Sequence, residues 1–411
     1  MVKIIILKKS NLKKSSLPLP ICLFFILFLL LLIGNLFNVS AFLYIDDFIG
    51  LIGVLLSPYL ISKKKYRFSL FSLILLFIFG IIGNSLSGYP RSMLLILEDY
   101  FFVFKFAFIF ILFDCFLGKS KKHLPSLLFL ITVTFSILIL IMFPVCLYQV
   151  MSGQEKANFF CGYSGCVGLY CFLFLIVFTF SKGFFALNKK SNFFLSFLQL
   201  ISVLTCILSK SSTSFVFILL FLSFLLFLNF PKKKLLLVSA FALVLLISFF
   251  LFKSKILGYL FSNSAPRNNL FIESFHLLAE HFPFGIGFSL FGGKIAANNY
   301  SPLYYDLGWN NTYTLGINSS FLLDTYFPTI IGEIGFLGVI SFFLLTYSFF
   351  KIITSSVKGK NTYYKLMGAF LLVCILISGF FFNFINSGVG VSFIILAIVF
   401  SKISKSISLK V

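Results

Sequence analysis

The sequence predicts an all-helical polytopic membrane protein with about twelve transmembrane helices and one large extracytoplasmic loop that contains an amphipathic helix. Three observations lead to this fold class. Of the 411 residues, 60% are hydrophobic and 63 are Phe, the mean hydropathy is +1.09, and apolar runs long enough to cross a bilayer recur along the chain. Soluble domains do not have such a composition.

The predicted spans are apolar runs of about 17 or more residues, with shorter runs included where a turn ends them. They cover residues 17–36, 41–61, 68–87, 94–117, 124–148, 163–181, 193–209, 214–230, 235–252, 326–350, 366–384 and 389–401. Because irregular backbone cannot satisfy its N–H and C=O groups in hydrocarbon, we expect the polar segment between the ninth and tenth spans to lie in water or to line a cavity. The chain therefore divides into residues 1–252, the loop 253–325 and residues 326–411.

Most of the 33 Lys and Arg residues form clusters between the predicted spans, and every cluster falls on one side of the predicted membrane. The positive-inside rule makes that side the cytoplasm, so we expect both termini to be cytoplasmic and the 253–325 loop to be extracytoplasmic. The net charge of +22 therefore reflects topology, and no nucleic-acid partner is expected. The first apolar run is interpreted as a retained span, because no small-residue cleavage site follows Leu36.

Several kinds of chemistry find no support in the motifs. The chain has no Walker loop and no G-x-S-x-G, which argues against ATP-driven transport and α/β-hydrolase activity. No His/Cys cluster has zinc spacing, so no metal site is predicted. Cys161 and Cys166 lie near the predicted outer surface, either as free thiols or as a disulfide.

The loop begins with a predicted helix of about eighteen residues, in which Ser264 is the N-cap and Pro283 provides the stop. At about 100° per residue, Arg267 and His281 fall on the same side as the apolar Leu270. A cation on that face either snorkels at the bilayer surface or binds a phosphate with its guanidinium.

The rest of the loop is rich in Gly and then in aromatic residues and amides. Residues 284–293 predict a tight turn that exposes backbone, and residues 298–318 contain Asn, Tyr, Thr and the only Trp, Trp309. Aromatic faces and amides suit sugar rings, but an interfacial aromatic belt has the same composition. Both interpretations remain open from the sequence.

Charged residues inside the predicted spans allow two interpretations. Charges near a helix centre are costly on insertion scales, at about 2.5–3.5 kcal/mol each. Lys105 lies deepest and is expected to pair with Asp46 or Asp47, whereas Asp99 lies near the outer end of its span. We interpret the group as a structural ion pair with polarity near an outer cavity; the alternative is the ion or substrate pathway of a secondary transporter or exporter.

The order of motifs in and after the loop resembles the superfamily of O-antigen polymerases and O-antigen ligases. The elements are Arg267, Pro283-Phe-Gly-Ile-Gly287, Asp324 and Glu333-Ile-Gly-Phe-Leu-Gly338. The predicted topology is similar as well. A further similarity is Leu208-Ser-Lys-Ser-Ser-Thr213, where family members often carry Ser-x-Ser-Arg-Thr; this chain has Ser212 at the position of the Arg and a cation at Lys210 instead.

The resemblance implies a metal-independent glycosyltransferase, without cofactor, that polymerises polyprenyl-diphosphate-linked oligosaccharide repeats of a bacterial surface polysaccharide. It implies a location in the bacterial cytoplasmic membrane and a possible chain-length regulator protein as partner. Asp324, where ligases usually carry His-Asn, favours the polymerase branch over the ligase branch. An exporter of polysaccharide or lipid-linked sugar is the alternative from another class.

The resemblance also implies roles for individual residues. Cations would stabilise the departing diphosphate, and a general base would assist the acceptor hydroxyl. The candidate diphosphate-binding residues are Arg267, Lys210 and Arg91. The candidate bases are Asp324, His281 and Glu273. The supporting residues are Glu333, Gly285, Gly287, Gly335 and Gly338.

Overall fold

The computed structural model describes residues 18–185, 188–229, 265–312, 314–317, 319–323, 325–354, 362–380, 383 and 385–408. Within these ranges the chain is helical and contains no strand. Eight helical stretches are long and apolar enough to cross a membrane. They are α1 (Leu19–Phe37), α2 with α3 (Ser40–Leu43 and Ile45–Ile61), α4 (Lys64–Leu86), α5 (Met93–Lys119), α6 (Leu124–Met151), α7 (Ser164–Phe184), α8 (Lys189–Ser209) and α14 (Phe327–Thr354).

Three shorter apolar helices complete the agreement with the predicted spans: α9 (Ser212–Asn229), α15 (Thr362–Ser378) and α16 (Gly388–Ser408). The predicted span 235–252 lies outside the described residues. The all-helical fold class is therefore confirmed, and the number of membrane crossings stays a prediction.

The chain forms two compact units. Unit 1 comprises Met1–Ile45, Leu117–Lys253 and Lys402–Val411. Its central helix is α7, which is buried along almost its whole length and packs against α6, α8 and α9. A hydrogen bond of 2.7 Å joins the hydroxyls of Thr132 and Ser181, and thereby links α6 to α7. Cys161 and Cys166 are both buried free thiols in this unit.

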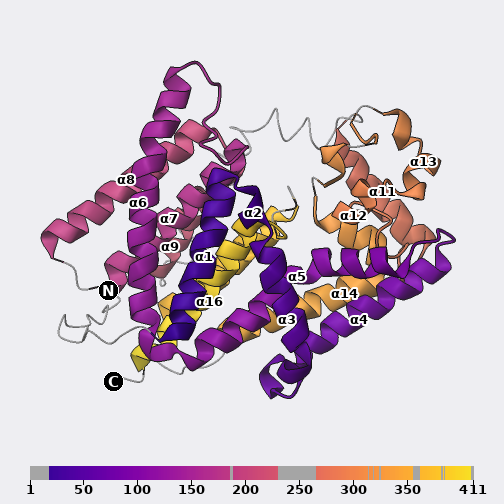
Figure 1. Cartoon of the computed structure of the whole chain (residues 1–411), viewed down its shortest axis with the longest axis horizontal. Coiled ribbons are helices and arrows are strands. Elements are labelled where there is room, and N and C mark those ends of the chain that lie inside the picture. The colour runs from indigo at the N-terminus through magenta and orange to yellow at the C-terminus, as the bar shows by residue number, and fades with distance from the viewer. Residues whose placement is uncertain are drawn as a thin grey trace. The chain divides into compact units, whose positions relative to one another are not determined.

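Unit 2 comprises Asp46–Phe116 and Ser254–Ser401, so its packing joins α3, α4 and α5 to the loop and to the helices that follow it (Figure 1). Its longest interface is that between α4 and α14, where the hydroxyls of Ser69 and Ser348 are 2.7 Å apart. The loop helix α11 (Pro266–Glu280) also packs on α14. These packing units are a different division of the chain from the predicted segments 1–252, 253–325 and 326–411.

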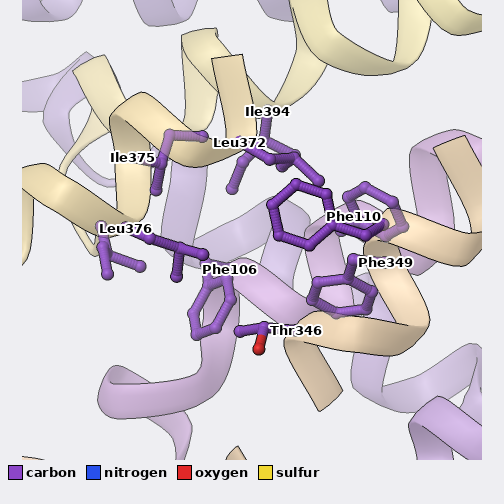
Figure 2. A pocket seen from close by; sticks show the side chains of 10 residues that line it. Phe106, Phe110, Thr346, Phe349, Leu372, Ile375, Leu376 and Ile394 are labelled. Atoms are coloured by element: carbon purple, nitrogen blue, oxygen red, sulfur yellow. The ribbon is translucent and has the colours of Figure 1, made fainter. Parts of the chain in front are cut away.

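A small gap of about 20 Å³ lies among α5, α14, α15 and α16 (Figure 2). Its lining is apolar apart from Thr346, whose hydroxyl already donates to the Phe343 carbonyl at 2.9 Å. A water molecule needs two or more polar partners. The gap therefore lacks the partners that would hold a water, and it is a packing defect rather than a ligand site.

The loop helix α11 differs from the predicted helix at both ends. Its N-cap is Ala265 rather than Ser264, with Pro266 in the first turn and no side-chain cap. It ends at Glu280, because the chain turns back through His281, whose carbonyl accepts the N–H groups of Phe284 and Gly285 at 3.0 Å each. The helix is thus 15 residues long, shorter than the expected length.

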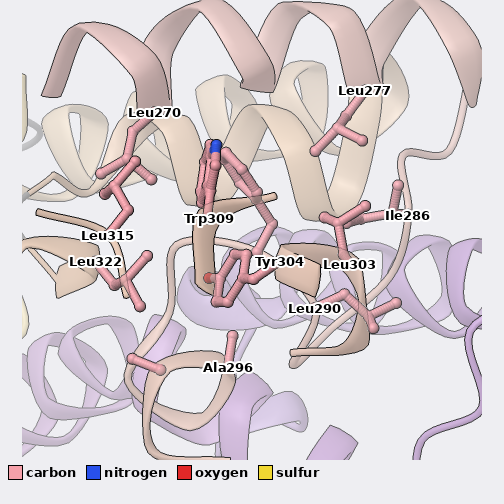
Figure 3. Packing of buried hydrophobic residues seen from close by; sticks show 12 residues of the cluster. Leu270, Leu277, Ile286, Leu290, Ala296, Leu303, Tyr304, Trp309, Leu315 and Leu322 are labelled. Carbon is pink, nitrogen blue, oxygen red and sulfur yellow. The ribbon is translucent and has the colours of Figure 1, made fainter. Parts of the chain in front are cut away.

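The aromatic part of the loop folds into a hydrophobic core of its own (Figure 3). Trp309 is only 8% exposed and stacks on the buried Tyr304 with ring centroids 5.3 Å apart. Both rings lie in one cluster with Leu270 and Leu277 of α11. Neither predicted role, a sugar-binding face nor an interfacial belt, fits Trp309 and Tyr304, because these two rings are used for packing within the loop.

Candidate functional site

Two buried carboxyl groups hold the glycine-rich part of the loop against the long helices. Asp99 of α5 accepts the backbone N–H of Ser289 at 2.8 Å. Glu333 of α14 accepts the N–H groups of Leu290 and Phe291, each at 3.1 Å. Hydrogen bonds from backbone N–H to a carboxylate are among the stronger protein hydrogen bonds. These bonds fix three successive loop residues.

The two glycine motifs named in the resemblance contact each other directly. Helix α14 is interrupted at Gly335, which has φ 61° and ψ −161°, and Gly285 lies against this break with φ 70°. The N–H of Gly287 donates to the Glu333 carbonyl at 2.8 Å. Because no Cβ fits between Gly335 and Gly285, the motifs form one backbone-to-backbone joint that aims the Glu333 side chain at the loop.

Gly338, the last residue of the second motif, lies one turn beyond the break. A Cβ at this position would come within 2.5 Å of the Ile334 side chain. Its missing side chain thus makes room for Ile334 where α14 resumes after the break.

A cavity of about 260 Å³ lies beside this joint within unit 2. Its walls come from α5, from the loop around the start of α12 (Lys294–Asn298), from the start of α14 and from residues 383–387. The lining residues with polar or aromatic side chains that bear on its chemistry are Phe102, Lys105, Lys294, Tyr326, Asn383 and Asn386.

One wall of the cavity is a buried ion triad. Nζ of Lys105 lies 2.6 Å from Oδ2 of Asp46 and 2.5 Å from Oδ1 of Asp47. The predicted pairing of Lys105 is therefore confirmed, with both carboxylates rather than one. A lysine held by two carboxylates has its charge offset within the protein, as burial of such a charge requires.

The candidate residues on α11 lie in a partly exposed setting. Arg267 in the first turn and His281 after the last turn are both half-buried, and Glu273 is half-buried between them. Burial raises the pKa of Glu273, an effect that His276 opposes and Glu280 reinforces. A raised pKa brings a carboxylate closer to the range useful for a general base at neutral pH.

Arg91, in the turn between α4 and α5, is close to the carboxylates that hold the loop. Burial lowers the pKa of Arg91, and the neighbouring Tyr304, Glu333 and Asp99 oppose that shift. Its Nη1 donates to the Asn299 carbonyl at 3.5 Å, whereas its Nε and Nη2 are buried and have no partner among the described residues. Arg91 therefore lies beside the loop joint rather than in the lining of the cavity.

The remaining two candidates are Lys210 and Asp324. Lys210 belongs to unit 1, where it is the exposed C-cap of α8 in a left-handed conformation, φ 48°. Asp324 lies outside the described residues, although its neighbour Leu323 lines the cavity. The convergence of Arg267, Lys210 and Asp324 stays a prediction.

Sequence reasoning missed Lys294, Asn383 and Asn386 as cavity residues, and Asp99 as the partner of the loop backbone. The sequence did contain one indication of this site, since Lys294 is the only Lys or Arg between Arg267 and Lys351.

No protein-family model matches the chain, and no curated protein is detectably similar to it.

Proposed function

We propose that the protein is a membrane glycosyltransferase that polymerises polyprenyl-diphosphate-linked oligosaccharide repeats of a bacterial surface polysaccharide at the outer face of the cytoplasmic membrane. The observation that carries the proposal is the cavity in unit 2. It places an ammonium group, amides and aromatic rings beside helices that are apolar enough to cross a membrane. A lipid-linked glycan needs a polar site for its sugars and phosphates next to an apolar path for its tail.

The proposed reaction transfers a glycan from its diphosphate to a sugar hydroxyl. The bond between the anomeric carbon and the diphosphate oxygen breaks, and the acceptor oxygen forms the new glycosidic bond. The acceptor proton passes to a general base, for which Asp324, His281 and Glu273 are the candidates. The negative charge that develops on the leaving diphosphate is stabilised by fixed cations, with Arg267 as the first choice.

Deleting the gene and sizing the surface glycan tests this function. Loss of a polymerase leaves single repeats on the carrier, whereas loss of a ligase leaves polymer that is not attached to its acceptor. Loss of an exporter leaves the units facing the cytoplasm. Normal polymer in the deletion strain would disprove the proposal.

Replacing Arg267 tests the assignment of the diphosphate-binding cation. Arg267→Ala is expected to lower polymer formation about 10²–10³-fold, the usual loss when one charge-stabilising donor is removed, and Arg267→Lys should recover part of it. The measurement is polymer amount and length at matched membrane expression. Arg67→Ala is the control, because Arg67 is exposed at the start of α4. Unchanged polymer in Arg267→Ala would remove Arg267 from the mechanism.

A pH profile tests Glu273 as the base. A carboxyl accepts a proton only when ionised, so activity that depends on Glu273 falls as the pH drops through its raised pKa. Glu273→Gln should then lower the rate about 10²–10⁴-fold and abolish this acid limb, measured as initial polymerisation rates in reconstituted vesicles. The control is Glu280→Gln, an exposed carboxyl on the same helix, which should keep the acid limb but move it to lower pH, because Glu280 reinforces the raised pKa of Glu273. An acid limb that persists in Glu273→Gln would assign the base to another group.

A further inference from the structure

Two lysines line the cavity, and only one of them is available to bind a ligand. Lys105 is held by Asp46 and Asp47, and its side chain is only 5% exposed. Lys294 is half-buried and forms no ion pair with any described residue. Its ammonium instead lies 4.2 Å from the centre of the Phe102 ring. Among the described residues of the lining, Lys294 is thus the cation available to bind an anion.

Two other lining residues are Asn383 and Asn386. Their side-chain oxygens are buried and accept no hydrogen bond from any residue that the structure describes. A buried acceptor without a donor is unfavourable, so a ligand that donates a hydrogen bond to one of these oxygens would be stabilised. Hydroxyl groups can both donate to an amide oxygen and accept from its NH₂.

Two hydrogen bonds fix the backbone just before Lys294. The N–H of Gly292 donates to the hydroxyl of Tyr304 at 2.7 Å, and the N–H of Phe291 donates to Glu333. Tyr304 is itself fully buried in the loop core. The ammonium of Lys294 is therefore presented from a rigid backbone, which lowers the entropy lost when it binds a ligand.

We propose that Lys294 is the anion-binding residue of this cavity, and that the cavity binds a hydroxylated anion, namely a sugar that carries a phosphate or a carboxylate. The ammonium of Lys294 binds the anionic oxygen, and the amides of Asn383 and Asn386 bind the hydroxyls. The aromatic faces of Phe102 and Tyr326 supply apolar contact for a sugar ring. The inference rests on the proposed function only in taking this ligand to be part of a lipid-linked glycan.

Direct binding to the full-length protein in phosphatidylcholine nanodiscs tests the assignment. The probes are glucose 1-phosphate for the phosphate source, glucuronic acid for the acidic-sugar source, and glucose as the neutral reference. We expect at least one anion to bind more tightly than glucose, and Lys294→Gln to weaken that binding about tenfold or more, as for loss of a charge-assisted hydrogen bond. Lys294→Arg should restore most of it, and glucose binding should not change.

The control is Lys351→Gln, which makes the same change in charge at an exposed position of α14 and should bind every probe like the wild type. Thermal unfolding confirms that each variant is folded. Preference for glucose 1-phosphate identifies the phosphate source, and preference for glucuronic acid identifies an acidic sugar. Equal binding by Lys294→Gln and wild type, or no preference for either anion over glucose, would overturn the assignment. Because this readout requires no polymer, it is separate from the deletion test of the proposed function.

Discussion

Gly335→Ala is expected to destabilise unit 2 strongly, because the backbone conformation and the close packing at this residue both exclude a side chain. The backbone of Gly335 has φ 61° and ψ −161°, a region that L-residues avoid at a cost of about 1–3 kcal/mol. A Cβ at this position would also come within 2.3 Å of the backbone nitrogen of Gly285. That backbone cannot move away as a flexible side chain would, and overpacking adds about 1–3 kcal/mol.

The measurement is the yield of monodisperse protein in detergent and the midpoint of its thermal unfolding. Gly183→Ala is the matched control, because a Cβ at Gly183 meets nothing within 4 Å and the residue lies in helix α7. There the same substitution is expected to be neutral or to stabilise by up to about 1 kcal/mol. A Gly335→Ala variant that folds and unfolds like the wild type would show that α14 is not broken at this residue.

The long apolar helices could be predicted from the sequence because the length of an apolar run indicates a helix that is able to cross a membrane. The residues at which these helices begin and end were predicted less accurately. Helix α4 begins at Lys64, four residues before the expected start at Phe68. An apolar run marks only the part of a helix that can lie in hydrocarbon. Lys and Arg are good helix formers, so a helix can continue beyond its apolar run into flanking Lys and Arg residues.

The loop was harder to predict because its contacts join residues far apart in sequence. Trp309 and Tyr304 were interpreted from composition alone, yet their environment is set by Leu270 and Leu277, some thirty residues earlier. Asp99 and Ser289 are 190 positions apart. The resemblance named Gly285 and Gly335 as supporting residues, but it gave no indication that the two contact each other or that α5 supplies a second carboxylate.

The cavity shows the same limit. Lys105 was correctly expected to be paired, since a charge inside a span needs a partner. Lys294, Asn383 and Asn386 are ordinary polar residues in their own segments, and only the fold places them around one space. The identity of a polar residue gives its chemistry, but its neighbours decide whether that chemistry is available to a ligand.

Glu333 provides the second prediction with a large expected effect, because its two possible roles respond differently to two substitutions. Glu333→Ala removes the acceptor of two buried N–H groups, those of Leu290 and Phe291. Each unsatisfied donor costs about 1–3 kcal/mol, so the loss should be about 2–6 kcal/mol. Helix α14 and the loop would then separate at the joint, and the yield of monodisperse protein in detergent would fall.

Glu333→Gln keeps the oxygen that accepts the N–H groups of Leu290 and Phe291, and replaces the second carboxyl oxygen by an NH₂ group. Oε2 of Glu333 and Oδ1 of Asp99 are both buried, and the two carboxyl groups are hydrogen-bonded to each other. The amide of Gln places an N–H₂ donor at this contact. We therefore expect Glu333→Gln to unfold within about 1 kcal/mol of the wild type, since each group retains a partner.

Polymer formation in the same two variants then separates a supporting role from a catalytic one. If Glu333 only holds the loop, Glu333→Gln should make polymer of normal length, and Glu333→Ala should fail in proportion to its loss of folded protein. Glu280→Ala controls for loss of a carboxylate, because Glu280 is exposed. A Glu333→Gln protein that is stable but makes no polymer would assign the carboxylate to the reaction itself. The loop joint would then be part of the active site, and the bonds to Leu290 and Phe291 would serve to orient Glu333.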